Sequence, residues 1–232
     1  MTAAANTLPS PDHSAEAPRR PEEPPKPLFR GVMHMVAAVF APVGLVLLLL
    51  IADSPRRYVA AAVFATSLIL LYATSAAYHV APWSRRLGEF MMRADHSSIF
   101  VLIAGTYTPF CLVTLDLQWG IPMLAVVWSL AAAGIVVAIV WPRAPRWLSV
   151  SLYLAIGWIG VIPAAQVVPA LPAPGLALLA AGGALYSIGA LVYATRRPDP
   201  FPRVFGFHEV FHALVVAGSL LHFTVIAVYV VS

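Results

Sequence analysis

The chain has 232 residues, of which 60% are hydrophobic and only 10% are charged. A typical soluble domain carries about 25% charged residues, so this composition excludes an ordinary soluble protein and predicts an integral membrane protein. The formal net charge of +4 does not indicate a nucleic-acid partner, because the distribution of basic residues between loops explains it. Cys111 is the only cysteine, so an intrachain disulfide is excluded. It lies in an apolar run, which predicts an inert buried thiol.

Residues 1–28 are polar and rich in proline. They contain no continuous apolar stretch of the kind that a signal peptide requires. A segment of this composition cannot bury enough apolar surface to offset the entropy lost on ordering, so we expect a disordered cytoplasmic tail. The remaining residues, 29–232, form the predicted transmembrane domain.

Seven apolar runs follow the tail, and each is long enough to cross the roughly 30 Å hydrocarbon layer as an α-helix. Short connections that contain proline, such as those at Pro55, Pro82 and Pro142, separate them. Pro163 falls inside a predicted helix, where neighbouring helices can tolerate a kink. The predicted fold class is therefore all-α, a seven-transmembrane-helix bundle with spans near 29–51, 57–81, 95–115, 119–141, 147–168, 174–195 and 206–230.

Basic residues are distributed very unevenly between the predicted loops. Twelve of the fourteen lysines and arginines fall in the tail and in the loops after the second, fourth and sixth spans, and only Arg56 and Arg57 fall on the other side. Positively charged loops stay in the cytoplasm. We therefore expect a multi-pass protein of the plasma membrane, with a cytoplasmic N-terminus and with Ser232 outside.

In this topology five of the seven histidines would lie at the same depth, near the cytoplasmic face. Histidine is costly in hydrocarbon and rarely occurs there without a partner, so a cluster of histidines indicates a functional site. The five are His34, His79, His96, His208 and His212.

The spacing of three of these histidines predicts a metal site. His208 and His212 are four residues apart at the start of the last span, and His79 ends the second span four residues after Ser75. Residues four apart share one helix face. Asp95, at the start of the third predicted span, adds a carboxylate at the same level. Two histidines from one helix, a third from another, and a water or carboxylate are a plausible zinc set.

Other interpretations remain open for the residues around this triple. His34 and His96 could be hydrogen-bonding partners between helices rather than ligands. Ser75 could bond to the backbone of its own helix. Asp95 could pair with an arginine such as Arg93.

The stretch from His208 to His212, His-Glu-Val-Phe-His, also matches the H-E-x-x-H pattern of zinc proteases, in which the glutamate is the general base. Intramembrane metalloproteases resemble this pattern but carry a third-ligand motif on a later helix, and no helix follows the last span here. A protease is therefore disfavoured, and Glu209 is kept as a neighbour of the site. His222 follows His208 by about 21 Å along a helix, so it cannot share a metal with it.

Three motifs in order resemble the bacterial hemolysin III proteins, which belong to the progestin and adipoQ receptor family. They are Ser75-Ala-Ala-Tyr-His79, the stretch from Asp95 to Phe110, and the stretch from His208 to Phe223. The resemblance covers the chain from about residue 29 and implies seven helices, a cytoplasmic N-terminus and a zinc ion held by His79, His208 and His212. It also implies that the plasma membrane in question is a bacterial inner membrane. It also implies that Ser75 and Asp95 neighbour a zinc-bound water. Adiponectin receptors resemble this pattern with Gln at the position of Glu209, which argues against a zincin-type role for that residue.

The sequence therefore predicts a zinc-dependent hydrolase that acts on a lipid amide or ester with an acyl chain, as in the similar alkaline ceramidases. Asp95 and Ser75 are the candidate catalytic residues, and membrane lipids are the expected partners. The alternative is a protein without enzymatic activity, in which a structural zinc ties the helices together. Such a protein would sense the state of the membrane or perturb it, as the hemolysin name suggests. The sequence does not indicate an oligomeric state.

The predicted topology can be tested with single cysteines introduced at positions 54 and 199. The positive-inside rule places Ser54 outside and Asp199 in the cytoplasm. A membrane-impermeant thiol reagent added to intact cells should label the cysteine at position 54 and spare the one at position 199. Labelling of position 199 from outside would overturn the common depth of the histidines.

Overall fold

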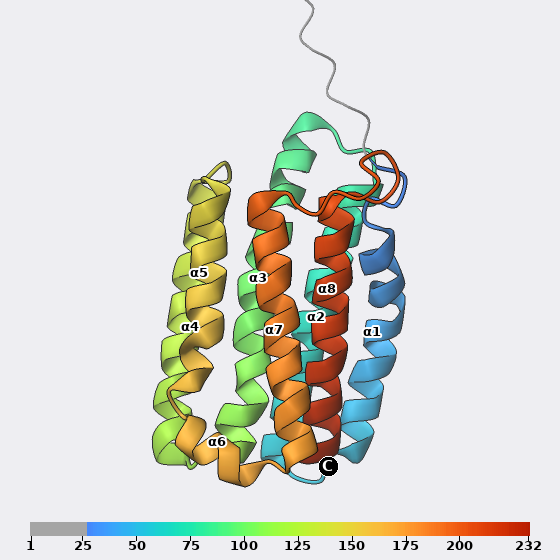
Figure 1. The fold of residues 1–232 in the computed structure, drawn as a ribbon. Helices are drawn as coiled ribbons and strands as arrows, with labels where there is room; N and C mark the ends of the chain where they lie inside the picture. The colour runs from blue at the N-terminus through green and yellow to red at the C-terminus, as the bar shows by residue number, and fades with distance from the viewer. Residues whose placement is uncertain (1–26) are drawn as a thin grey trace, which may run out of the picture.

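The computed structural model describes residues 27–232 (Figure 1). The predicted disordered tail, residues 1–28, lies outside the described residues except for its last two positions. The described part consists of helices joined by short connections, and its only β feature is an isolated bridge between Phe201 and Phe205. The predicted all-α fold class is confirmed.

Eight α-helices, three of them continued by short π or 3₁₀ segments, make up the described chain. Their bounds are α1 Val32–Ile51, α2 Pro55–Val80, α3 Arg85–Pro109 with η1 Phe110–Thr114, α4 Leu117–Val140, α5 Arg146–Trp158 with η2 Ile159–Val161, α6 Ala164–Ala170, α7 Ala173–Thr195, and α8 Phe207–Val225 with η3 Ile226–Val230.

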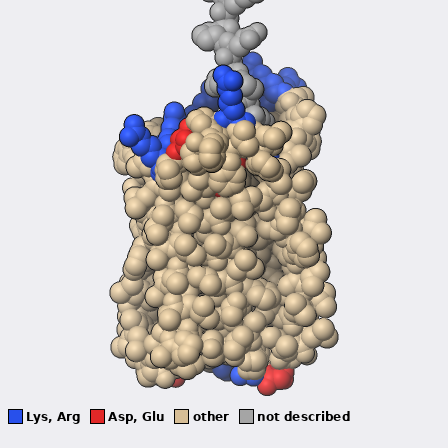
Figure 2. Space-filling view, turned by 45° about the vertical axis from the view of Figure 1, so that its right-hand side comes forward, with Lys and Arg blue, Asp and Glu red and all other residues tan. Residues whose placement is uncertain are grey.

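Six of these helices are long and apolar enough to cross a membrane, and there are seven spans in the described chain if the bent pair of α5 and α6 counts as one. Charged side chains gather at the two ends of the molecule in Figure 2, and the band between them is free of them on the face shown. This band is what a hydrocarbon layer requires, because charged groups there are costly. The chain is a multi-pass membrane protein.

The helices form a closed bundle whose neighbours largely follow chain order. Each of α1 to α4 contacts the next helix, α5 contacts α7, and α8 packs against both α7 and α1 (Figure 1). The last helix therefore returns to the first, so the start of α8 lies beside the start of α1 and the end of α2. This closure brings together the segments that carry the predicted site.

Helix α3 begins ten residues before the predicted span of 95–115. The added segment contains Arg85, Arg86 and Glu89, which do not belong in hydrocarbon, so hydropathy placed the boundary too late. The segment is helical because arginine, leucine and methionine favour helices. A contact of 3.7 Å between Arg85 Nε and Glu89 Oε1 adds the i,i+4 pairing that stabilises an exposed helix. Asp95 therefore lies in the third turn of α3.

The fifth span is broken rather than kinked. Helices α5 and α6 meet at a bend of 63° near Pro163, which lacks the backbone N–H that a continuous helix requires. The Tyr107 hydroxyl of α3 repairs the break. It donates to the Gly157 carbonyl at 2.6 Å and accepts from the Gly160 N–H at 2.7 Å. A side chain thus satisfies backbone groups that would otherwise be unpaired inside the membrane.

Glycines of α7 allow α8 to approach closely. Gly175, Gly182 and Gly189 are buried and recur every seven residues on the face toward α8 and its continuation η3. A Cβ atom at Gly182 would lie 2.4 Å from Cδ2 of His222. Small residues at such positions are a common device of membrane helix packing, because they bring two backbones into contact.

Two neighbouring glycines of α7 provide a matched test of this packing. Gly182→Ala should destabilise the protein by about 1–3 kcal/mol, because the added methyl group overpacks the contact with His222. Gly183→Ala is the control, because a Cβ there meets nothing within 4 Å. It should be neutral or stabilising by up to about 1 kcal/mol. Thermal unfolding of both variants in the same detergent checks the difference, and equal stabilities would contradict the packing described.

Candidate metal centre

Three histidines from two helices converge at the end of the bundle where α1 begins. His79 comes from the last turn of α2, and His208 and His212 come from the first two turns of α8. One possible ligand atom from each lies within 4.8 Å of the other two. Nε2 of His79 and Nε2 of His208 are 3.1 Å apart. The structure brings together the triple that the sequence predicted.

The starts of α1 and α8 hold this cluster in place. Gly31 precedes α1 with φ of 81°, in the left-handed region that favours glycine. A Cβ there would lie 2.7 Å from Cβ of His79, so glycine lets the chain pass close to this histidine. The backbone N–H of Phe29 donates to the carbonyl of Val204 at 3.1 Å, which ties the segment before α1 to the loop before α8.

Asp95 and Ser75 lie next to the three histidines. Oδ2 of Asp95 is 3.7 Å from Nε2 of His79, and the Ser75 hydroxyl donates a hydrogen bond to the Asp95 carboxyl group. Both side chains are buried. The Ser75 hydroxyl can therefore orient the Asp95 carboxyl group beside the cluster.

His34 lies against the cluster without belonging to the group of three. Its ring stacks on His212 with centroids 3.8 Å apart and an interplanar angle of 11°. The ring also meets Tyr72 edge-on, with centroids 5.2 Å apart. A stacked ring restrains the rotation of its neighbour, so His34 and Tyr72 hold the imidazole of His212 in one orientation.

Glu209 is engaged away from the three histidines. Its Oε1 is 2.8 Å from Nε of Arg30, and its Oε2 accepts the backbone N–H of Gly206 at 2.8 Å. The second bond caps the start of α8, whose first N–H groups lack helical partners. Burial lowers the pKa of Arg30, and the nearby Glu209 carboxylate opposes this shift. Arg30 stays charged at neutral pH, so Glu209 is one half of a buried ion pair.

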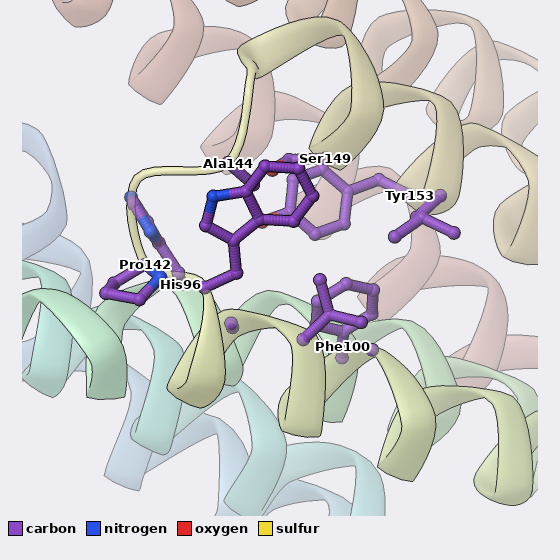
Figure 3. Close-up of a pocket in the computed structure, with 11 residues that line it drawn as sticks. His96, Phe100, Pro142, Ala144, Ser149 and Tyr153 are labelled. Atoms are coloured by element: carbon purple, nitrogen blue, oxygen red, sulfur yellow. The ribbon is translucent and has the colours of Figure 1, made fainter.

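His96 lies outside the group of three histidines and lines two cavities. It lines a small cavity of about 10 Å³ between α3, α4 and α5, together with Phe100 and Tyr153 (Figure 3). A space of this size has room for about one water molecule. His96 also borders the large cavity described below. Within the described residues, the group of possible metal ligands does not include it.

Arg146 and Tyr193 also border the site. Sequence patterns indicate neither of them as a site residue, and Arg146 stands out only as a basic loop residue. The Arg146 guanidinium lies 5.4 Å from the ring centroid of Tyr193 and 5.7 Å from that of Phe207. Tyr193 in turn meets His208 edge-on at 5.9 Å. These contacts connect α5, α7 and α8 at the mouth of the site.

A cavity of about 590 Å³ extends from His208 and His212 into the bundle. Such a volume lies within the usual range for small-molecule sites. Its polar end includes Ser75, Asp95 and His208, and its far end reaches Val167 of α6 at the opposite end of the bundle. Most of the residues that line it between these ends are apolar. Its shape and chemistry suit a chain-like apolar molecule with a polar group at the histidine end.

The donor set fits a zinc ion. Three imidazole nitrogens suit zinc, and three protein ligands with a fourth position left for water or substrate are typical of catalytic rather than structural sites. The group of possible ligands within the described residues consists of His79, His208 and His212. Asp95 stands beside this group, where a water or a substrate oxygen would lie.

Comparison with known proteins identifies the family. The sequence model of the haemolysin-III related family matches residues 23–223. The chain belongs to this family. It is 34% identical to a hemolysin-3 homolog of Bacillus subtilis (strain 168) over 207 residues, which cover 88% of this chain and 94% of the relative. It is 32% identical to hemolysin-3 of Bacillus cereus over 206 residues, 88% of this chain and 91% of the relative.

A more distant likeness extends to eukaryotic proteins. The chain is 30% identical over 184 residues to the heptahelical transmembrane protein ADIPOR1 of Oryza sativa subsp. japonica, which covers 72% of this chain and 48% of that protein. The resemblance to hemolysin III and to the adiponectin-receptor relatives is thus confirmed. The bacterial relatives agree with the predicted location in a bacterial plasma membrane.

The metal centre can be tested by elemental analysis of purified variants. Wild-type protein should hold about one zinc ion per chain, and His79→Ala, His208→Ala and His212→Ala should each lower zinc occupancy and stability, since metal binding is coupled to folding. His222→Ala is the control with a histidine of the same helix, and it should retain the metal. Full occupancy in a variant that lacks both His208 and His212 would exclude this site.

Proposed function

We propose that the protein is a zinc-dependent hydrolase that cleaves an amide or ester bond of a membrane lipid. The observation that carries this proposal is a buried carboxylate, Asp95, placed between three zinc-type ligands and a long apolar cavity. A purely structural zinc site requires neither an adjacent carboxylate nor a cavity. A lipid hydrolase needs both, because the reacting carbonyl must reach the proton-transfer group while its acyl chain stays in an apolar environment.

The histidine set would hold the metal, with His79 on α2 and His208 and His212 on α8. Bound zinc supplies a Lewis acid that polarises a carbonyl group and lowers the pKa of water to about 7. The remaining steps fall to the side chains of the protein. Asp95 takes a proton from the attacking water as the new C–O bond forms. It then returns the proton to the departing amine or alcohol as the C–N or C–O bond breaks, which leaves a fatty acid and the second product.

Ser75 and the surrounding aromatic rings would prepare this carboxylate and these imidazoles. The hydrogen bond from Ser75 fixes the orientation of Asp95, and the stack of His34 on His212 restrains a ligand. Pre-organised groups of this kind need no rearrangement during the reaction, which is where much of the catalytic advantage of enzymes arises.

The second carboxylate is assigned a structural role. Glu209 occupies the position of the general base in the H-E-x-x-H pattern, but its two oxygens are bound by Arg30 and by the Gly206 N–H. Removing its charge should therefore disturb the start of α8 more than the chemistry. In a protease-like mechanism, by contrast, Glu209 would be the general base.

Asp95→Asn and Glu209→Gln test the assignment of the base. Asp95→Asn should keep most of the zinc and lower the rate of hydrolysis by about 10²–10⁴-fold, as expected for the loss of a general base. Glu209→Gln should retain zinc and much of the activity, because the amide oxygen can still cap Gly206. The measurement is fatty-acid release from a ceramide-like amide in nanodiscs, with zinc content determined on the same samples.

The opposite pattern, with Glu209→Gln inactive and Asp95→Asn active, would reverse the assignment. If zinc-loaded wild-type protein hydrolyses no acyl amide or ester, the enzyme proposal fails. The alternative then takes its place, in which the metal ties α2 to α8 in a membrane sensor or a membrane-perturbing protein.

A further inference from the structure

His96 and Tyr153 form the wall between the two cavities. The small cavity of about 10 Å³ and the large cavity of about 590 Å³ have these two residues in common and no others. Asp95, the residue before His96 on α3, lines the large cavity. His96 therefore stands between the polar end of the large cavity and a second space that the proposed reaction does not use.

The small cavity lies at the end of the bundle that the distribution of arginines assigns to the cytoplasm. Its lining includes Trp141, Pro142 and Ala144 of the connection between α4 and α5 (Figure 3). Trp141 is 52% exposed, so the cavity lies directly beneath the surface of this connection. Its volume has room for about one water molecule. A water in the small cavity would contact His96 from the cytoplasmic side.

The imidazole of His96 is free to exchange a proton with water. It has no hydrogen-bond partner within the described residues, 27–232. Its nitrogens are not among the fully enclosed unpartnered atoms, which include Nδ1 of His222 and both ring nitrogens of His34. Both nitrogens of His96 therefore keep accessible surface. A histidine that only joins helices would be bonded to a neighbour, whereas a neutral imidazole in contact with water can take up a proton and pass it on.

The proposed hydrolysis leaves one proton that must depart from the site. The attacking water brings two protons. Asp95 passes one to the departing amine or alcohol, and the other stays on the new carboxyl group. A carboxyl group is ionised at neutral pH, so this second proton has to leave as the product is released. Most of the lining of the large cavity is apolar, which restricts the exit of the proton to the polar end.

We propose that His96 carries this proton from the product acid to the water at the cytoplasmic end. The proposal rests on the proposed function, because it requires a product acid in the large cavity. The O–H bond of the acid breaks, and its proton binds to the unprotonated nitrogen of the neutral His96 ring, directly or over one water. The imidazolium then gives a proton to a water or a buffer base at the small cavity. The neutral ring is restored, and the product leaves as a carboxylate.

Access of position 96 to water is tested first, without any measurement of catalysis. His96→Cys is combined with Cys111→Ala, which removes the only natural cysteine. A small water-soluble thiol reagent, applied to the predicted cytoplasmic side in inside-out vesicles, should label position 96. Ser98→Cys in the same background is the control and should stay unlabelled, because Ser98 is 1% exposed and lines neither cavity.

Steady-state hydrolysis of the ceramide-like amide in nanodiscs then tests the transfer itself. His96→Ala and His96→Gln should keep their zinc and lower the steady-state rate about 10²-fold, the lower end of the contribution of a positioned proton-transfer group. The first turnover, measured as a rapid burst of fatty acid, should keep the wild-type rate. Only the later departure of the proton is slowed, whereas a misshapen site would slow the first turnover as well.

A diffusible base should replace the missing ring in one variant alone. 2-Methylimidazole should restore most of the steady-state rate of His96→Ala, where the shortened side chain leaves room for it, and should have little effect on His96→Gln. Its methyl group, next to both nitrogens, hinders binding to a metal ion. Wild-type protein and His222→Ala are the controls, because His222 lines only the large cavity. The base should accelerate neither.

An unlabelled position 96 would overturn the proposal whether or not the protein is an enzyme. So would a His96→Ala variant that keeps the wild-type steady-state rate in dilute buffer or that 2-methylimidazole does not accelerate. If position 96 is labelled but the wild type hydrolyses no acyl substrate, the proposed function fails and no proton remains for His96 to carry. If the His96 variants do not fold, diethyl pyrocarbonate on the wild-type chain decides. His96 should be modified faster than His222, and equal protection of the two would reject the relay.

Discussion

The arrangement of this protein depends on the cost of placing polar groups in hydrocarbon. Each such group must find a partner inside the bundle, because no water is available in the membrane core. The histidines at the α1 end meet this requirement together, since their rings contact one another between α1, α2 and α8. Each neutral imidazole has one N–H group and one nitrogen lone pair, and the lone pair needs a hydrogen-bond donor or a cation. A cation between His79, His208 and His212 would satisfy one nitrogen lone pair of each ring, which supports the metal site proposed for these three residues.

The same constraint separates the two carboxylates near the cluster. Glu209 is fully enclosed, with a guanidinium on one oxygen and a helix N–H on the other, so its charge stabilises the start of α8. Asp95 has only the hydroxyl of Ser75 and a more distant imidazole as its polar neighbours among the contacts described, and it borders the cavity. A carboxylate that is already fully paired is a poor proton acceptor. The less enclosed carboxylate, facing a space that a substrate can enter, is the better candidate base.

Much of this arrangement could be predicted from the sequence, because periodicity and charge are local properties. The spacing of four between His208 and His212 placed both on one face, and the distribution of arginines placed His79 at the same depth. The bend between α5 and α6 and the early start of α3 were missed, since hydropathy reports membrane boundaries rather than helix boundaries.

Contacts between distant segments could not be predicted from such patterns. His34 and His96 looked equivalent in the sequence, yet the structure stacks His34 on His212 and directs His96 toward α4 and α5. The difference arises because α1 closes on α8 while α3 lies further round the bundle. Arg30 likewise appeared only as part of a basic flank. Its pairing with Glu209 follows from the backbone bonds between residues 28–29 and 203–204, which link segments more than 170 residues apart.

The cavity is a consequence of unequal packing around the bundle. Glycines draw α7 onto α8, so these two helices leave little space between them. The broken fifth span packs less closely. The Tyr107 hydroxyl bonds to the backbone near the break and so stabilises the bend. The space lies between this bent span, α3 and the tight pair. A site that accepts a membrane lipid requires this combination, in which rigid helices carry the reacting groups and a less regular wall accommodates the chain.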